Sequence, residues 1–423
     1  MSAFTIISVL IFLSALFGYV NSRFLKLAPT VGLMLQALVL SFILIGLDYL
    51  GVPGIDSAQS LVSDIDFNQI IFNGVLSFLL FAGALQVTLA SLNAVRAQVF
   101  TLATLGVIGS TIIVGFGVYG LFRLVALDIP LTYCLLFGAL ISPTDPIAVL
   151  PIMRRAKVPA NLEALITGES LFNDGFGVVV FIILLQLVTG ESSLPIPAEA
   201  AVLFAEEAVG GFVFGLVLGY LGYWIVRTID DYPVEILITL ALVTAGYAVA
   251  QAIGISGPLA MVVAGIVIGN HGRSKGMSER TTENLDRFWE MVEIILNAAL
   301  FVLIGLEAVA FAADFSLVRL LVGFAVIPVV LAARFISVGV PMAILRPVPD
   351  VSWRSTPLIT WAGLRGAIPV ALVLSLPPGP NRSVLAIVTY IVVVFSILVQ
   401  GTTIKYFVER RVKRTPPSET AET

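Results

Sequence analysis

The chain has 423 residues, of which 58% are hydrophobic and 12% are charged, with a formal net charge of −4. Its mean hydropathy is +1.04. Because a soluble domain carries about a quarter of its residues as Asp, Glu, Lys or Arg, this composition excludes a soluble enzyme, a nucleic-acid-binding protein and a disulfide scaffold. Cys134 is the single cysteine and His271 the single histidine, which excludes an internal disulfide and clustered His or Cys metal sites. The sequence predicts an all-α polytopic membrane protein.

Apolar runs separated by Gly, Pro and charged residues predict about 13 transmembrane helices, because roughly 18–20 apolar residues cross a bilayer. We expect these spans near residues 3–20, 28–47, 67–88, 99–121, 130–151, 163–188, 201–226, 233–251, 257–271, 288–308, 317–345, 355–376 and 383–408. A transmembrane domain therefore covers residues 1–408, and a short cytoplasmic tail covers residues 409–423.

The distribution of Lys and Arg predicts the orientation of the chain. If the N-terminus lies outside, 18 of the 23 Lys and Arg residues fall in inner loops or the tail. Only Arg123, Arg319 and Arg382 fall in outer loops. Since positive residues accumulate on the cytoplasmic side, we expect a multi-pass protein of the inner or plasma membrane, with its C-terminus in the cytoplasm.

Two of the predicted spans are interrupted. The span at 130–151 contains Ser-Pro-Thr-Asp-Pro at 142–146, and the span at 355–376 contains Gly-Leu-Arg-Gly-Ala-Ile-Pro at 363–369. Prolines remove backbone donors and disfavour helix before them. Because the two breaks occupy matching places, they predict two inverted six-helix repeats with crossing, interrupted helices. The repeats cover residues of about 1–190 and 233–408, and a linker helix covers about 200–226.

Interrupted helices in matching positions indicate an ion site near the middle of the membrane. The plainer interpretation is that Pro and Gly are simply common in membrane helices. We favour the ion site because each break also carries one charged residue, Asp145 in the first and Arg365 in the second.

Five ionisable residues lie well inside predicted spans: Asp145, Glu169, Asp174, Arg334 and Arg365. Each costs about 2.5–3.5 kcal/mol at the centre of a membrane helix. Such residues usually pair with one another and mark an ion pathway. A buried ion-pair network with a purely structural role is the alternative, and we expect some of the five to serve in that way.

Helical geometry sorts the residues of the span at 163–188. At about 100° per residue, Ser170 and Asp174 share one face, whereas Glu169 and Asn173 share the adjacent face. We therefore assign Ser170 and Asp174 to the ion and Glu169 to an arginine. Hard cations prefer carboxylate, hydroxyl and carbonyl oxygens, which Asp145, Asp174, Ser170 and the Thr144 carbonyl supply.

The charges of the core sum to −1, because it holds three carboxylates and two arginines. One monovalent cation or one proton would neutralise that charge. If both compete for Asp174 at a site that opens alternately to the two sides, the result is antiport. We expect no resident cofactor, since Na⁺ and H⁺ are then transported substrates.

Three segments resemble the monovalent cation:proton antiporter family, specifically the sodium/proton exchangers of NhaP/NHE type. They are SPTDPIAV at 142–149, GESLFNDG at 168–175 and GLRG at 363–366. The weaker matches MVVAGIVIG at 261–269 and FVLIGL at 301–306 support the resemblance, which spans essentially the whole chain.

The resemblance implies a thirteen-helix homodimer with an elevator-like core and a dimerisation part. It implies that Asp174 carries H⁺ and Na⁺ in turn, that Thr144, Asp145 and Ser170 coordinate the ion, and that Asn173 steadies the site. It further implies that Glu169 pairs with Arg334 and that Arg365 supports the second interrupted helix. An Asn-Asp pair such as Asn173-Asp174 is typical of electroneutral members.

One segment departs from the pattern of the family. Many relatives carry two acids in the third span, where this chain has Ala82 and Gln86. This departure bears on ion preference and affinity more than on the reaction class. Glu290 and Glu293, at the inner end of the span at 288–308, either attract cations or merely suit a helix N-terminus.

The sequence therefore predicts a secondary antiporter that exchanges cytoplasmic Na⁺, or Li⁺, for external H⁺. A K⁺/H⁺ antiporter on the same fold is the nearest alternative. An ion channel and a non-transporting sensor are more distant ones, and the sensor is disfavoured because no soluble output domain is apparent. No phosphate-binding loop of an ATP-driven pump is present.

Overall fold

The computed structural model describes residues 3–50, 75–146, 149–189, 202, 205–273, 277–311 and 316–412. Within these ranges every regular element is a helix, apart from two isolated β-bridges. Helices are expected, because a membrane-embedded chain must satisfy its backbone hydrogen bonds internally.

Nine helices of the described ranges are long and apolar enough to cross a membrane. Five of them are single helices: α2 (Pro29–Tyr49), α11 (Ala160–Thr189), α14 (Tyr232–Ala252), α17 (Glu279–Leu306) and α19 (Leu317–Ile344). Two join a helix to one π-helical turn: α1 (Ala3–Val20) with Asn21–Leu25, and Ala205–Val209 with α13 (Gly210–Val226). The last two join two helices through a π-helical turn: α7 (Arg96–Thr101) with α8 (Val107–Leu124), and α22 (Pro380–Phe395) through Ser396–Gln400 with α23 (Gly401–Val412).

Shorter helices complete the described part of the chain. Three are apolar: α5 (Leu76–Leu85), α9 (Leu131–Ile141) and α15 (Gly257–Val267) with the turn Ile268–Gly272. The others are α6 (Leu89–Ala94), α10 (Leu150–Arg155), α18 (Ala308–Phe311), a 3₁₀ turn at Trp353–Ser355, α20 (Thr356–Ala362) and α21 (Ile368–Leu374).

The all-α polytopic fold is confirmed, and each of the predicted spans overlaps a described helix or pair of helices. The two interrupted spans appear as the pairs α9/α10 and α20/α21, which are separated by non-helical backbone at the expected residues. The first residues of the spans predicted at 67–88 and 201–226, and the tail from residue 413 onward, lie outside the described residues.

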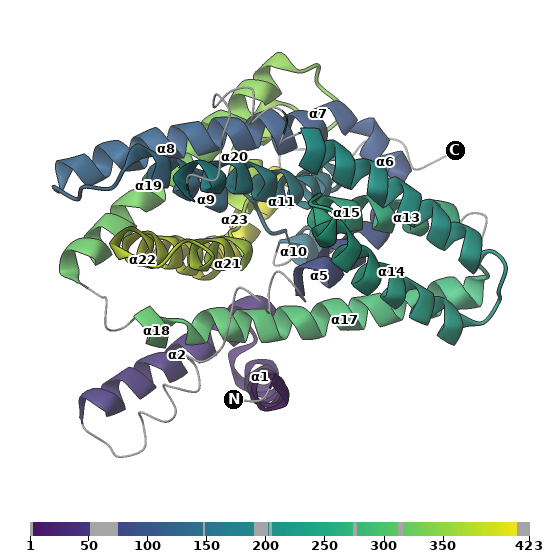
Figure 1. Ribbon diagram of the computed structural model, residues 1–423, viewed down its shortest axis with the longest axis horizontal. Coiled ribbons are helices and arrows are strands. Elements are labelled where there is room, and N and C mark those ends of the chain that lie inside the picture. Colours follow the sequence, from purple (N-terminus) through teal and green to yellow (C-terminus); the bar gives the residue numbers. More distant parts are fainter. Residues whose placement is uncertain are drawn as a thin grey trace.

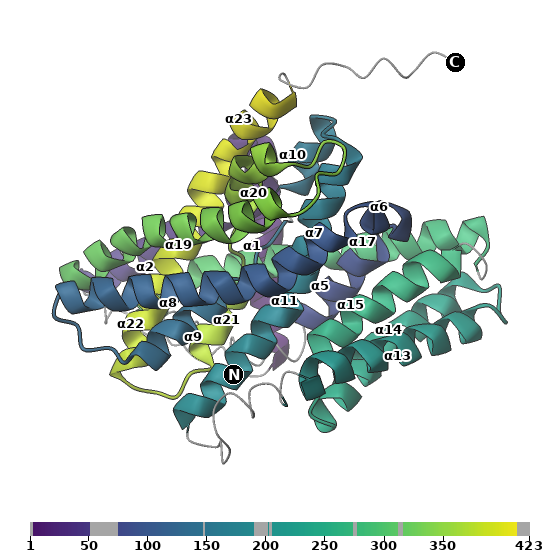
Figure 2. The same ribbon diagram turned by 90° about the horizontal axis from the view of Figure 1, so that it is seen from above.

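The helices form two groups around the centre of the molecule. In one group α17 packs against α1, α2, α5 and α14, while α15 packs against α5 and α13. In the other group α8 packs against α9 and α19, α9 packs against α11, and α22 packs against α19 and α21. Figure 1 shows α17 below the centre beside α1 and α2, with α8, α9 and α19 above it. Figure 2 shows α13, α14 and α15 together on one side.

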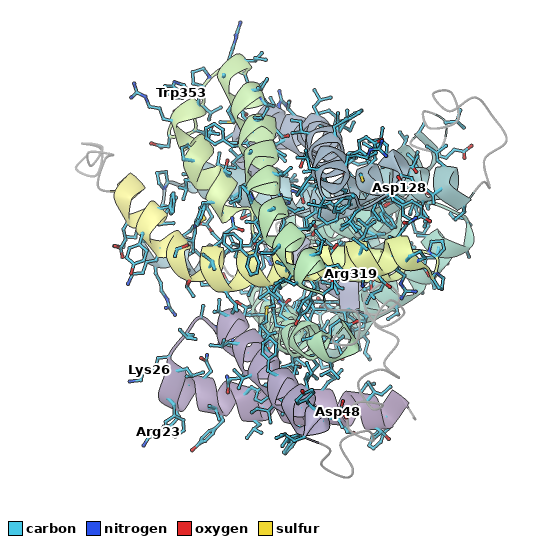
Figure 3. All side chains as sticks on the ribbon, turned by 90° about the vertical axis from the view of Figure 1, so that its left-hand side faces the viewer. Arg23, Lys26, Asp48, Asp128, Arg319 and Trp353 are labelled. Carbon is cyan, nitrogen blue, oxygen red and sulfur yellow. The ribbon has the colours of Figure 1, made fainter. Side chains whose placement is uncertain are left out.

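Loops predicted on opposite sides of the membrane lie at opposite ends of the molecule. In Figure 3 Arg23, Lys26 and Trp353 lie toward one end of the helices. Asp128 and Arg319 lie toward the other end. This separation is what alternating membrane crossings require.

Close packing of α9 on α8 depends on Gly138, because a Cβ atom there would meet the backbone of Thr111, including its Cα at 3.0 Å. We expect Gly138→Ala to lower the melting temperature in detergent, since overpacking costs about 1–3 kcal/mol. Gly120→Ala on α8 is the control, because nothing lies within 4 Å of the place that its Cβ atom would occupy. Equal melting temperatures for the two variants would contradict the packing argument.

Candidate ion-binding site

The two helix breaks lie side by side and pair with each other through the backbone. The Asp145 N–H donates to the Leu364 carbonyl at 2.8 Å, which makes an antiparallel β-bridge. Pro143 and Pro146 flank this point and have no N–H of their own. The pairing satisfies buried backbone groups that neither helix can satisfy at its break.

Arg365 ties the second break to the first helix. Its side chain is 2% exposed, and Nη1 donates to the carbonyls of Ser142 at 2.5 Å and Pro143 at 2.8 Å. Its backbone N–H donates to Ser396 Oγ at 2.8 Å. A cation at the C-terminal end of α9 is favourable, because unpaired carbonyls give that end a negative potential. Arg365 therefore supports both breaks and not the second one alone.

A buried ion pair joins α11 to α19. Arg334 donates from Nη1 and Nη2 to the two carboxylate oxygens of Glu169, each at 2.6 Å. Both side chains are buried, at 5% and 1% exposed. This two-pronged geometry is the strong form of the Arg–carboxylate pair, and it neutralises one of the three core carboxylates.

Asn173 connects this ion pair to the first break. Its amide nitrogen donates to Glu169 Oε1 at 2.9 Å and to Thr144 Oγ1 at 2.8 Å. Its amide oxygen accepts from the Thr144 N–H at 3.2 Å. Both amide protons and the carbonyl are therefore used inside the protein, so that Asn173 holds Thr144 in place.

A cavity of about 300 Å³ adjoins this network, and Thr144, Asp145, Ser170 and Asp174 line it. Thr144 Oγ1 and Ser170 Oγ lie 2.9 Å apart. Asp145 and Asp174 are half-buried. Among the described residues, the Asp174 carboxylate has no hydrogen-bond or ion-pair partner, although its charge interacts with those of Asp145, Glu169 and Arg365.

Glycine in the second break allows Asp145 to reach the cavity. A Cβ atom at Gly366 would collide with the Asp145 carboxylate. Gly363 likewise leaves room for Arg334 Nε and Thr144 Cγ2, which would lie 2.9 and 3.1 Å from a Cβ there. The glycines of the break therefore serve close approach of the charged side chains.

The eight residues singled out from the sequence lie in one contiguous group with two faces. Four of them face the cavity, namely Thr144, Asp145, Ser170 and Asp174. The other four lie behind it as a buried network, namely Glu169, Asn173, Arg334 and Arg365. The polar side-chain atoms of the four residues that line the cavity are all oxygens. The chemistry of the cavity therefore suits a hard monovalent cation or a proton.

Several polar residues outside these eight also line the cavity, and the sequence left open whether one of them, Glu293, attracts cations. Gln86, Arg154, Glu163 and Glu293 are among them. Arg154 Nε donates to Glu163 Oε1 at 2.9 Å, and Gln86 Nε2 donates to Glu293 Oε2 at 3.0 Å. The only sequence signal for Glu293 was its place at the inner end of a predicted span, which it shares with Glu290.

Comparison with curated proteins finds relatives that match nearly the whole chain. The chain is 46% identical over 424 residues to the Na(+)/H(+) antiporter NhaP of Pseudomonas aeruginosa, covering 99% of each chain. It is 35% identical to the Na(+)/H(+) antiporter NhaH of Halobacillus aidingensis, covering 92% of this chain and 93% of the relative.

A solved structure shares the fold at low sequence identity. The sodium proton antiporter MjNhaP1 from Methanocaldococcus jannaschii at pH 8 superposes with a TM-score of 0.74 and 19% identity, covering 96% of this chain and 97% of that one. Residues 11–410 match the family described as "Sodium/hydrogen exchanger, transmembrane". The chain is thus a membrane transporter that belongs to the sodium/hydrogen exchanger family.

Proposed function

We propose that this transporter exchanges cytoplasmic Na⁺, or Li⁺, for external H⁺ by alternating access, with Asp174 as the shared carrier. The observation that carries the proposal is the Asp174 carboxylate itself. It faces the cavity with no hydrogen-bond or ion-pair partner among the described residues, beside the oxygens of Asp145, Ser170 and Thr144. The names of the two relatives, which are Na(+)/H(+) antiporters, support the same pair of ions.

Charge balance supports an exchange of one cation for one proton. Arg334 neutralises Glu169 through the two-pronged ion pair. Among the five charged core residues, Arg365 is then the remaining positive charge beside Asp145 and Asp174, which leaves this group of five with a net charge of −1. One Na⁺ or one H⁺ restores neutrality, so each form of the carrier that changes sides carries the same charge. No resident cofactor enters this scheme.

The membrane arrangement in this proposal has thirteen crossings, with inverted repeats at about 1–190 and 233–408 and a linker helix at about 200–226. The pairing of the α9/α10 and α20/α21 breaks supports it. The opposite ends at which Figure 3 places the labelled residues fit alternating crossings. The distribution of Lys and Arg supports an external N-terminus and a cytoplasmic C-terminus. Assembly as a homodimer stays a prediction from the family.

The cavity opens, on this orientation, toward the cytoplasm. Gln86, Thr88 and Arg154 line it and are exposed. Arg154 and Gln86 flank loops that the distribution of positive charge places inside. The described conformation is therefore the one in which the carrier exchanges Na⁺ and H⁺ with the cytoplasmic solution.

Asp174→Asn should abolish cation-dependent proton movement while leaving the protein folded, because an amide can neither release a proton nor neutralise Na⁺. Purified protein in proteoliposomes, with an internal pH dye and Na⁺, Li⁺ and K⁺ tested in turn, measures this. Asp128→Asn is the matched control, since its side chain is exposed and does not line the cavity. Cation-coupled proton flux in Asp174→Asn would refute the carrier role, and a response to K⁺ alone would identify a K⁺/H⁺ antiporter.

Exchange should be unaffected by membrane voltage, because each cycle moves no net charge. Holding the voltage at zero with valinomycin and equal K⁺ on both sides should leave the initial rate of Na⁺-driven alkalinisation unchanged. A rate that increases under the clamp would show electrogenic exchange and contradict the one-for-one charge balance.

Glu169→Gln should lower the melting temperature strongly, because it leaves Arg334 buried without a counter-charge, at a cost of about 3–5 kcal/mol. Glu283→Gln is the control, since its pair with Arg287 is solvent-exposed and such pairs contribute about 0–1 kcal/mol. Scanning fluorimetry in detergent compares the two variants. Equal melting temperatures would rule out a structural role for the buried pair.

A further inference from the structure

A further carboxylate, that of Glu293, faces the cavity from the wall opposite Asp145 and Asp174. Glu293 lies on α17 and lines the same 300 Å³ space. The helix α17 packs against α1, α2, α5 and α14, whereas the Asp residues lie on the α9 break and α11. Figure 1 shows the same division, with α17 below the centre and α9 and α11 above it.

The charge of Glu293 is not neutralised by an ion pair among the described residues. Gln86 on the neighbouring helix end donates to Oε2 at 3.0 Å, which fixes the carboxylate and leaves Oε1 for another partner. The arginine at the mouth of the cavity, Arg154, is already paired with Glu163 at 2.9 Å. The negative charges of Glu293 and Asp145 interact, so a cation between them would relieve their repulsion.

Position distinguishes Glu293 from the other acid at the inner end of α17. Glu290 is exposed and does not line the cavity. Glu293 is half-buried within it. A negatively charged cleft with low-dielectric walls raises the local concentration of cations. Of the two acids only Glu293 lines the cavity, although the charges of Glu290 and Arg154 also act on it.

We propose that Glu293, held by Gln86, is a cation-binding residue on the opposite wall of the cavity, which the ion meets before it reaches Asp174. This inference rests on the proposed function, because it concerns the same cavity and the same ion. The carboxylate faces Asp145 and Asp174 from α17, and Gln86 at the end of α5 holds it. Any displacement of one wall against the other therefore changes the distance of Glu293 from the carrier. It therefore contributes to affinity in the conformation described, not to the chemistry of exchange.

The test begins with direct Na⁺ binding, so that it does not depend on transport. The rise in melting temperature with NaCl, at constant ionic strength set with choline chloride, gives an apparent dissociation constant for Na⁺ in detergent. Glu293→Gln should raise this constant about fivefold, since a unit charge near 4 Å in a water-filled site contributes about that factor. Glu290→Gln should leave it unchanged.

Exchanging the carboxylate and the amide between positions 86 and 293 distinguishes a role in ion binding from a purely structural contact between α5 and α17. The double variant Gln86→Glu/Glu293→Gln keeps the amide–carboxylate pair but reverses it, and should restore the dissociation constant to within about twofold of the wild type. In proteoliposomes Glu293→Gln should raise the KM for Na⁺ on the cavity side by a similar factor and keep the maximal rate.

Two results would overturn the inference: Na⁺ affinity that is unchanged in Glu293→Gln, or affinity that stays low in the reversed pair although its melting temperature without Na⁺ matches the wild type. Failure of the proposed function looks different. Wild-type protein would then bind Na⁺ without moving protons. The dissociation constants of Na⁺ for the wild type and for Glu293→Gln would still decide the role of Glu293.

Discussion

The pairing of the two helix breaks is the constraint on which the rest of the site depends. A backbone hydrogen bond from the Asp145 N–H to the Leu364 carbonyl holds the breaks together. The guanidinium of Arg365 then binds the carbonyls at the end of α9. Non-helical backbone is tolerated at membrane depth only where protein or a water-filled cavity satisfies its hydrogen bonds. Removing either interaction would therefore leave backbone N–H or carbonyl groups unpaired at the breaks, beside the proposed carrier.

The face of α11 that lines the cavity is distinct from the face that holds the protein together. Glu169 and Asn173 have their hydrogen-bonding groups engaged by Arg334 and Thr144. Ser170 and Asp174, one residue further along the helix in each case, turn toward the cavity. A periodicity of 3.6 residues thus lets adjacent positions carry unrelated tasks. On the proposed mechanism, proton and cation exchange at Asp174 without disturbing the ion pair behind it.

Much of this arrangement could be predicted from the sequence, for physical reasons. Apolar length determines where helices lie, and Pro and Gly mark where two of them break, so the spans and both breaks were located. The spacing of Glu169, Ser170, Asn173 and Asp174 also predicted their two faces. Spacing along one helix cannot reveal partners on another, however. The double contact of Arg365 with the first break and the meeting of Gln86 with Glu293 arise from packing between distant segments.

The size of the cavity has a consequence for hydration. A space of about 300 Å³ holds on the order of ten water molecules, so a cation can travel to the oxygens of Asp145, Ser170 and Asp174 with most of its water shell intact. Dehydration is then confined to the final step, where protein oxygens replace water. Discrimination between cations of different radius would arise at that step alone, and the cavity would admit small and large alkali ions alike.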